Sequence, residues 1–491
     1  MRGIGGRGAT ALVVGSSGAV MVLELVSLRL VAPYLGLTLE TNTAVIGVAL
    51  AAIAVGAAFG GRFADAVPPT RSLGPLVLVA GAMVLLILPV VRWTGEAVRG
   101  GADGNVVFLA VTVALFIPAS LLAAVTPMVT KLRLQTLTQT GTVVGRLSAY
   151  ATVGAIAGTV LTGFVFVAKV PTSAIVLCLG GILAVAGATL TLYFRGLKAA
   201  AKPVALALVG TGLTLVAPRP CEVETAYHCA RVVADPDRPN GRTLYLDQLR
   251  HSYVDLADPT FLEFDYIKNL AVAIDSKWPA KQPVAALHVG GGGLTMPRYL
   301  TATRPGTENK VYEIDAGVIE VDKAELGVKP GSPELDIRIR DGRLGVRSEP
   351  SASRDLVIMD AFGGVAVPWH LTTRELVADV RRVLKPTGIY TVNVIDFGPQ
   401  AFVKAEVRTV AAEFAYVGVI AKPAELKGSE GGNFVLVASQ QPLQSEAIRQ
   451  RLGQRAELLD DPAAVRAFIG DAPLLTDDYA PVDQLLTPYP S

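Results

Sequence analysis

Glycines and carboxylates at the ends of short apolar runs are the residues of this chain most suited to chemistry. Four glycines follow the apolar run 284–289: Gly290, Gly291, Gly292 and Gly293. The next apolar run, 310–314, contains Glu313 and is followed by Asp315. Glycines let a backbone approach a ligand closely, and a carboxylate at the end of a second strand can accept hydrogen bonds from both hydroxyls of a ribose. This arrangement predicts a nucleoside site.

A third acidic element, Asp341-Gly342, follows the run 336–339, and its carboxylate could accept a hydrogen bond from an adenine amino group. Each carboxylate could instead lie in a solvated loop or cap a helix, but three of them at consecutive strand ends favour a ligand. The glycine run does not form Gly-x-Gly-x-x-Gly, and the chain has no Gly-Lys-Ser/Thr phosphate loop. An adenosine without a pyrophosphate, such as that of S-adenosylmethionine, therefore fits better than NAD or ATP.

Strands separated by helices are needed to bring these residues together. We predict a helix at 372–384 and strands at 284–289, 310–314, 336–339, 355–359, 388–394, 416–421 and 433–438. Such alternation indicates a Rossmann-like α/β domain with a parallel, doubly wound sheet. Ligands of such sheets bind at the carboxyl ends of the strands, which is where the glycines and acidic residues would lie.

The segment before this domain reads as β structure. Residues 223–233 and 243–247 predict strands, joined through a turn at 238–241, and together they suggest a small β-rich lid. We therefore divide the chain into a membrane domain at 1–218, a β-rich region with a linking helix at 219–283 and a Rossmann-like domain at 284–491.

The first part of the chain is apolar enough for a multi-span α-helical membrane domain. Charged residues make up only 18% of the whole chain and its mean hydropathy is +0.46, while a spanning helix needs about 20 apolar residues. Glu24 and Arg29 interrupt the first span and could line a pathway, although an ion pair with another helix, or extension of Arg29 to the interface, is favoured. Six candidate spans, and a shorter seventh at 203–217, are 10–33, 42–60, 73–91, 105–128, 148–168 and 172–194.

The side of the membrane on which the C-terminal domain lies depends on the number of spans. Basic residues in loops 61–72, 129–147 and 195–202 place these loops and the N-terminus in the cytoplasm. Six spans would leave the C-terminal domain in the cytoplasm, and a seventh would place it outside. Cys221 and Cys229 follow the seventh candidate, and a disulfide between them would require an oxidising compartment. Eight extended residues would hold the sulfurs too far apart unless the chain turns back. We favour seven spans with the domain outside.

Several motifs resemble those of the spermidine synthase family, including its members fused to a membrane domain. These motifs are His288-Val-Gly-Gly-Gly-Gly293, Tyr312-Glu-Ile-Asp315, Asp341-Gly342, Asp355-Leu-Val-Ile-Met-Asp360 and Leu475-Thr-Asp-Asp-Tyr-Ala-Pro-Val-Asp483. The resemblance implies a class I methyltransferase-type fold. It also implies that Glu313 holds the ribose, Asp341 holds the adenine and Asp360 is the catalytic carboxylate. His251 lies where the family has a substrate-facing polar residue. The residue pattern described above adds Gly290, Gly291, Gly292, Asp315 and Gly342 to the donor site.

The implied function is a membrane-anchored transfer of an aminopropyl group to an amine, as in polyamine biosynthesis. The co-substrate would be S-adenosylmethionine or its decarboxylated form, with no permanently bound cofactor. No metal is expected because the four histidines are scattered and form no His-x-x-x-His pair. The expected partners are the lipid bilayer, a small amine or other small-molecule acceptor, and a second copy of the soluble domain. A net charge of +2 gives no sign of a nucleic-acid partner.

The sequence departs from the family at two carboxylates that help to seat the amines of donor and acceptor. The family has an aspartate where this chain has Gly293, and a second one where it has Gly363. Residues such as Glu263, Asp265, Asp255 and Asp258 could compensate. The departures leave open a methyltransferase for a less cationic acceptor. Glu24 and Arg29 within the bilayer leave open a catalytically degenerate binding or transport protein.

Overall fold

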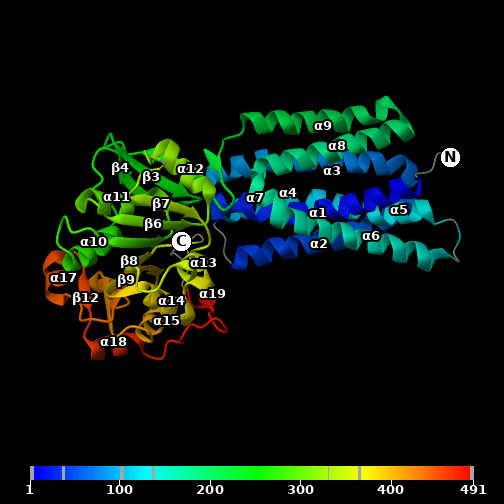
Figure 1. The fold of residues 1–491 in the computed structure, drawn as a ribbon. Coiled ribbons are helices and arrows are strands. Elements are labelled where there is room, and N and C mark those ends of the chain that lie inside the picture. The colour runs from blue at the N-terminus through cyan, green and yellow to red at the C-terminus, as the bar shows by residue number, and fades with distance from the viewer. Residues whose placement is uncertain are drawn as a thin grey trace. The chain divides into compact units, whose positions relative to one another are not determined.

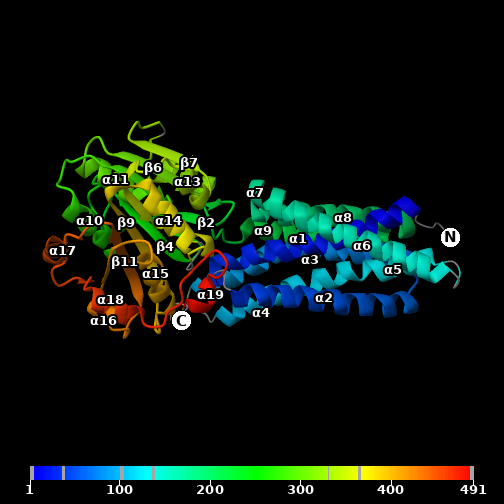
Figure 2. The same ribbon diagram turned by 60° about the horizontal axis from the view of Figure 1, so that its bottom comes forward.

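The computed structural model describes residues 5–35, 39–99, 104–134, 136, 139–329, 331–362 and 367–486. The chain divides into two compact units, Met1–Cys229 and Ala230–Ser491 (Figures 1 and 2). This division falls inside the segment 219–283 that the sequence assigns to the β-rich region. The first unit is largely helical, whereas the second contains nearly all of the strands.

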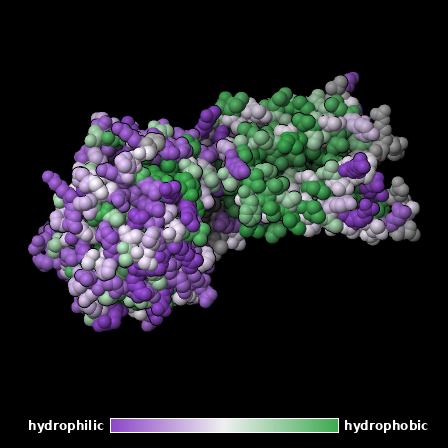
Figure 3. Space-filling model, in the orientation of Figure 1, coloured by the Kyte–Doolittle hydropathy of each residue, from purple (hydrophilic) through white to green (hydrophobic). Residues whose placement is uncertain are grey.

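Among its described residues, the first unit has seven helical stretches that are long and apolar enough to cross a membrane. Apolar side chains cover much of its visible face in Figure 3. The seventh stretch, α9, runs from Leu197 to Val216 and is longer than the predicted run 203–217, because Lys198 and Lys202 belong to its first turns. The remaining elements are α1 (Gly6–Leu35), α2 (Leu39–Ala66), α3 (Pro69–Arg99), α4 (Gly104–Ala123), α5 (Val125–Arg133), α6 (Thr140–Leu161), the π-helical turn η2 (Thr162–Phe166), α7 (Val167–Lys169) and α8 (Thr172–Arg195).

Glycines let the long helices of this unit pack closely. A Cβ on Gly154 of α6 would lie 2.3 Å from the carbonyl oxygen of Val14 in α1, and a Cβ on Gly187 of α8 would lie 2.2 Å from the backbone nitrogen of Leu78 in α3. Neither position could hold a larger residue without separating its helix pair. Small residues at helix contacts are typical of packing between helices in a bilayer.

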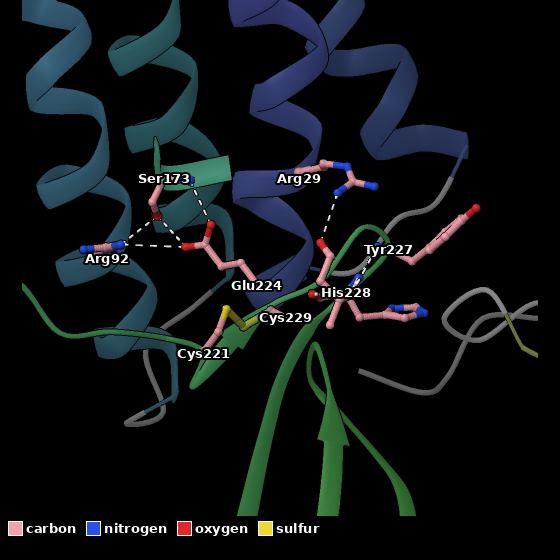
Figure 4. Close-up of a disulfide and its surroundings, with 9 residues drawn as sticks. Arg29, Arg92, Ser173, Cys221, Glu224, Tyr227, His228 and Cys229 are labelled. Carbon is pink, nitrogen blue, oxygen red and sulfur yellow. Dashed lines mark hydrogen bonds and ion pairs between the residues drawn. A yellow bond between two sulfur atoms is a disulfide. The ribbon is translucent and has the colours of Figure 1, made fainter. Parts of the chain in front are cut away.

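The segment after α9 turns back on itself and is closed by a disulfide between Cys221 and Cys229, whose Cα atoms are 5.1 Å apart (Figure 4). The side-chain oxygen of Thr225 accepts a hydrogen bond from the backbone N–H of His228 at 2.8 Å. The backbone N–H of Thr225 in turn donates to the carbonyl oxygen of His228. The predicted single strand 223–233 is therefore wrong. This turn breaks it into β1 (Val223–Glu224) and β2 (Cys229–Ala234).

Charged residues near the helix ends contact this disulfide-closed segment (Figure 4). The guanidinium of Arg29 donates to the carbonyl oxygens of Thr225 and Ala226. Arg92 donates to the hydroxyl of Ser173 at 2.8 Å, and the backbone N–H of Ser173 donates to the Glu224 carboxylate at 2.8 Å. Arg29 is thus engaged by backbone carbonyls from the end of the unit. These contacts, together with the disulfide, fix the chain between α9 and β2.

A small antiparallel sheet leads into the second unit. Its strand order is β1-β2-β3-β4, with β3 at Gly241–Leu246 and β4 at Leu249–Asp255. The predicted turn at 238–241 lies between β2 and β3. Strand β4 follows β3 after a two-residue turn, in which Asp247 has a φ of 55°.

The second unit is a Rossmann-like, methyltransferase-type α/β domain, as the sequence predicts. Its eight-stranded sheet has the order β12-β10-β11-β9-β8-β5-β6-β7. The strands are β5 (Ala285–Val289), β6 (Glu308–Glu313), β7 (Leu335–Ile339), β8 (Arg354–Met359), β9 (Leu384–Asp396), β10 (Tyr416–Ala421), β11 (Gly432–Ser439) and β12 (Glu457–Leu459). The helices are α10 (Asp265–Lys277), η3 (Gly292–Leu294), α11 (Thr295–Thr303), α12 (Ala316–Glu325), α13 (Gly342–Ser348), η4 (Trp369–Leu371), α14 (Arg374–Val383), α15 (Ala401–Ala411), α16 (Pro423–Leu426), α17 (Ser445–Leu452), α18 (Pro462–Ile469) and α19 (Val482–Leu485).

The sheet is mixed, so the prediction of an entirely parallel sheet is wrong at one edge. Strands β5 to β9 pair in parallel, whereas β11 pairs antiparallel with both β9 and β10. Parallel neighbours need a crossover of about a dozen residues or more. The connection from Ala421 to Gly432 is shorter and contains only the four-residue helix α16, so β11 returns antiparallel beside β10.

Apolar residues alternate along the central strands and form a core on each face of the sheet. Leu287 and Val357 belong to the core that includes α14 and α15, and Ala286 and Leu356 belong to the core that includes α10 and α11. Burial on both faces explains why these strands read as continuous apolar runs. The predicted site lies at the carboxyl ends of these strands.

Candidate functional site

The glycine run and the catalytic candidate meet at the ends of neighbouring parallel strands. Gly290 follows β5 with a φ of +97°, and a Cβ there would lie 2.3 Å from the carbonyl oxygen of Asp360. The backbone N–H of Asp360 donates to the carbonyl oxygen of Val289 at 2.9 Å. Gly290 therefore satisfies two demands, a left-handed backbone and close contact with the residue that ends β8.

Glu313 joins the glycine run to the end of β6. One carboxylate oxygen of Glu313 accepts the backbone N–H of Gly291 at 2.7 Å, and the other accepts the backbone N–H of Asp315 at 2.8 Å. The Asp315 carboxylate is buried and caps α12 by accepting from the backbone N–H of Gly317. The structure thus brings Glu313 to the glycines, whereas the side chain of Asp315 shapes the start of a helix.

Asp341 and Gly342 lie at the start of α13. One Asp341 oxygen accepts the backbone N–H of Leu344 at 2.9 Å and caps the helix, and the other lies 3.0 Å from Nε2 of His370. A Cβ on Gly342 would lie 2.4 Å from the side chain of Val289, at the end of β5. Each carboxylate oxygen has a second lone pair, so Asp341 retains the capacity to accept a further hydrogen bond.

His251 and Ser252 of β4 cover the second half of the glycine run. A Cβ on Gly292 would lie 2.7 Å from Nδ1 of His251, and a Cβ on Gly293 would lie 2.0 Å from the hydroxyl oxygen of Ser252. The space that an aspartate at position 293 would need is therefore filled by Ser252. The family difference at Gly293 is built into the local packing. Gly363, the other difference, lies outside the described residues.

Asp322 of α12 is a buried carboxylate beneath the glycine run. It is not among the site residues that the sequence predicts. Its Oδ1 accepts the backbone N–H of Gly293 at 3.2 Å, while its Oδ2 has no hydrogen-bond partner among the residues described. Burial raises the pKa of this carboxyl well above its usual value. No local pattern marks Asp322, because it lies within an amphipathic helix where acidic residues are common.

Two neutral side chains hold the carboxylate of Asp360. The amide of Asn393 in β9 donates to one oxygen at 2.9 Å, and the hydroxyl of Tyr266 in α10 donates to the other at 3.3 Å. Burial raises the pKa of Asp360 to about 6, and these two hydrogen bonds oppose the shift only in part. A carboxylate with a pKa near 6 is suited to take up a proton at neutral pH. The sequence does give one signal for Asn393, because it is a polar residue within an otherwise largely apolar strand.

A cavity of 510 Å³ opens beside Asp360. His251 lines it, so this histidine contacts both the glycine run and the cavity. Asp265 also lines it, whereas Glu263 does not. Most of its other lining residues are polar or charged: Arg250, Tyr266, Asn269, Asn393, Lys422, Glu425, Asn433 and Arg455.

Replacing Gly290 with alanine is expected to destabilise the second unit by about 1–3 kcal/mol, through backbone strain and the clash with Asp360. Thermal unfolding of the purified protein would measure this loss. Gly306→Ala is the matched control, because Gly306 also has a positive φ of +88° but its Cβ would meet nothing closer than 3.8 Å. Equal effects of the two substitutions would contradict the importance of the contact with Asp360.

Known proteins similar in sequence to this chain include polyamine aminopropyltransferases. The chain is 26% identical over 221 residues to a polyamine aminopropyltransferase of Vibrio vulnificus, an alignment that covers 42% of this chain and 70% of the relative. The chain is a homologue of the polyamine aminopropyltransferases. It is also 27% identical over 155 residues to the polyamine aminopropyltransferase of Chromobacterium violaceum, covering 31% of this chain and 58% of that protein.

Solved structures of spermidine synthases match about half of this chain. A probable spermidine synthase from Corynebacterium glutamicum matches 52% of this chain and 95% of its own, with 30% sequence identity and a TM-score of 0.48. The spermidine synthase of Thermotoga maritima matches 53% of this chain and 81% of its own, with 19% identity and a TM-score of 0.34. No protein-family model matches the chain.

Proposed function

We propose that this aminopropyltransferase homologue is a membrane-anchored transferase that moves an aminopropyl group from decarboxylated S-adenosylmethionine to an amine. The observation that carries the proposal is the contact between Gly290 and Asp360. It puts a carboxylate with a raised pKa, and the cavity beside it, next to the turn suited to a nucleoside. In this proposal the relatives' named activity is retained on a domain attached to apolar helices.

The donor would lie along the glycine run. Glu313 would accept the ribose hydroxyls with the lone pairs left after its bonds to Gly291 and Asp315. Asp341 would accept the adenine amino group, and His251 would close the site from β4. The sulfonium would then point toward Asp360 and the cavity.

The reaction follows from this placement. The lone pair of the acceptor amine attacks the methylene carbon next to the sulfonium sulfur and forms a C–N bond, while the C–S bond breaks and its electrons neutralise the sulfur. Methylthioadenosine leaves. The new ammonium loses one proton to the Asp360 carboxylate, whose raised pKa suits it to accept that proton. Tyr266 and Asn393 would hold this carboxylate in position.

Formation of methylthioadenosine tests this function. The purified full-length protein would be supplied with the decarboxylated donor and a panel of amines, and the product measured. The alternative, a methyltransferase, is motivated by Gly293, where Ser252 fills the space of the family's aspartate. Calorimetry with S-adenosylmethionine and its decarboxylated form would separate the two. Preference for S-adenosylmethionine, with no methylthioadenosine from any amine, would contradict aminopropyl transfer.

We further propose that the chain crosses the cell membrane seven times and that the second unit lies outside. Seven long apolar helices and a cytoplasmic N-terminus would leave the end of α9 on the outer side. The Cys221–Cys229 disulfide supports the same side, since disulfides persist in oxidising compartments. A donor made in the cytoplasm would then have to reach the outer side.

The disulfide provides the test of this topology. In a Cys178→Ser background, a membrane-impermeant maleimide is expected to label intact cells only after treatment with a reductant, because Cys221 and Cys229 would be outside and bridged. The double substitution of both cysteines by serine controls for other sites. Labelling of these cysteines only after lysis would overturn the outward placement.

A further inference from the structure

We infer that the acceptor carries an anionic group as well as an amine, so that it is an amino-acid-like zwitterion rather than a bare diamine. This inference rests on the proposed transferase function, because it names the acceptor class of the same cavity. It comes from the charges that line the cavity and from how each of them is already engaged.

The carboxylates of the cavity offer little to a polyamine. Asp265 pairs with Lys422 at 3.3 Å and with Lys268 at 3.5 Å. Glu425 is buried, and its Oε2 accepts the backbone N–H of Lys422 at 2.7 Å. Among the lining residues, Asp360 is the carboxylate held only by the neutral donors Asn393 and Tyr266. The cavity therefore presents one carboxylate suited to a cationic amine.

The other candidates for compensation are also engaged elsewhere. Asp255 and Asp258 both lie within ion-pair distance of Arg238, and Glu263 does not line the cavity. The segment 363–366, which is not described, reads Gly-Gly-Val-Ala and adds no charge. Among the described residues that line the cavity, the carboxylates other than Asp360 are thus already engaged.

Two cationic side chains of the cavity, Arg250 and Arg455, form no ion pair with a described residue, whereas Lys422 pairs with Asp265. The exposed Arg250 lies over the ring of Phe264, 5.1 Å from its centroid, and forms no ion pair with a described residue. Arg455 donates to Asn269 at 3.3 Å, while its buried Nε has no hydrogen-bond partner in the described part of the chain. A carboxylate on the acceptor would pair with these guanidinium groups, with its amine at Asp360.

Charge therefore discriminates against a bare diamine. A diamine would bring two positive charges beside Arg250 and Arg455, and like charges at short range disfavour binding. An α-amino acid with a distal amine has the same carbon chain and adds one carboxylate. Asn269, Asn393 and Asn433 provide neutral hydrogen-bonding groups between the two ends.

Binding of ligand pairs that differ by one carboxylate tests the inference. We would titrate the full-length protein in lipid nanodiscs, with methylthioadenosine present, with ornithine against putrescine and lysine against cadaverine. Each amino acid is expected to bind at least about tenfold more tightly than its diamine. Equal or tighter binding of the diamines, or no binding of any of the four, would overturn the inference.

Matched variants assign the preference to the cavity. Arg455→Met is expected to reduce the ratio of ornithine to putrescine affinity by about tenfold, and Lys427→Met, in the same unit but outside the cavity, to leave it unchanged. Turnover with the decarboxylated donor separates the two proposals. Preferred turnover of putrescine would support the transferase function and overturn the inference of a zwitterionic acceptor. Selective binding of the amino acids without transfer would support a site for a zwitterionic ligand and contradict the transferase function.

Discussion

Asp360→Asn is expected to lower turnover by about 10²–10⁴-fold while the protein remains folded. The amide keeps the size of the side chain but cannot take the proton released by the acceptor amine. The production of methylthioadenosine at saturating donor and acceptor would measure this loss. Asp336→Asn is the control, since Asp336 is an aspartate of β7 that pairs with Arg338 rather than lining the cavity. Unchanged turnover would instead favour a binding module.

The raised pKa of Asp360 adds two expectations with defined signs. As a base, Asp360 must be ionised, so the turnover number of the unsubstituted protein should fall below pH 6 and be about tenfold lower at pH 5. A carboxyl whose pKa is raised on folding contributes stability that is present at low pH and is lost as the pH rises through its folded pKa. The rise from 3.8 to about 6 corresponds to about 3 kcal/mol.

Asp360→Asn should therefore stabilise the folded protein at pH 7 by up to about 3 kcal/mol. The amide nitrogen cannot accept a hydrogen bond, so the loss of one of the bonds from Asn393 and Tyr266 would reduce this gain. The gain should fall as the pH is lowered from 6 to 4 and disappear near pH 3, where the unsubstituted carboxyl is largely protonated in both states. Denaturant unfolding at pH 7 and at pH 4 would show this difference. A substitution that lowers both stability and turnover at pH 7 would point to a structural role instead.

Glu313→Gln is expected to weaken binding of methylthioadenosine by about 10–100-fold. The amide retains one oxygen in place of two, so the backbone N–H of either Gly291 or Asp315 loses its acceptor. The charged acceptor for the ribose is lost at the same time, and a hydrogen bond to a charged group contributes about 1.5–3 kcal/mol. Calorimetric titration of the full-length protein would measure the change in affinity.

Glu320→Gln controls for the loss of one negative charge nearby, because Glu320 lies on the exposed side of α12 and pairs with Lys323. It should leave nucleoside affinity unchanged. Similar affinities for the Glu313 variant and the unsubstituted protein would remove Glu313 from the donor site. Glu313 would then hold the glycine run in place without contacting the nucleoside.

The sequence by itself determined which residues end the central strands. Apolar runs buried on both faces of a sheet stand out from their flanks, and parallel strands align their carboxyl ends. Gly290, Glu313 and Asp360 could therefore be placed at one edge before any contact was known. Hydropathy likewise identified most of the long helices, because spanning length and apolar composition are local properties of the chain.

Tertiary structure alone decided the features that depend on turns and on pairs distant in sequence. The turn at Thr225 brings Cys221 and Cys229 together, although an extended chain would separate them. The register of β9 and the position of α10 place Asn393 and Tyr266 on Asp360. The ion pair between Asp265 and Lys422 removes a candidate polyamine contact. Such contacts join residues far apart in the chain, so no local pattern specifies them, and they determine which charges the cavity can offer to an acceptor.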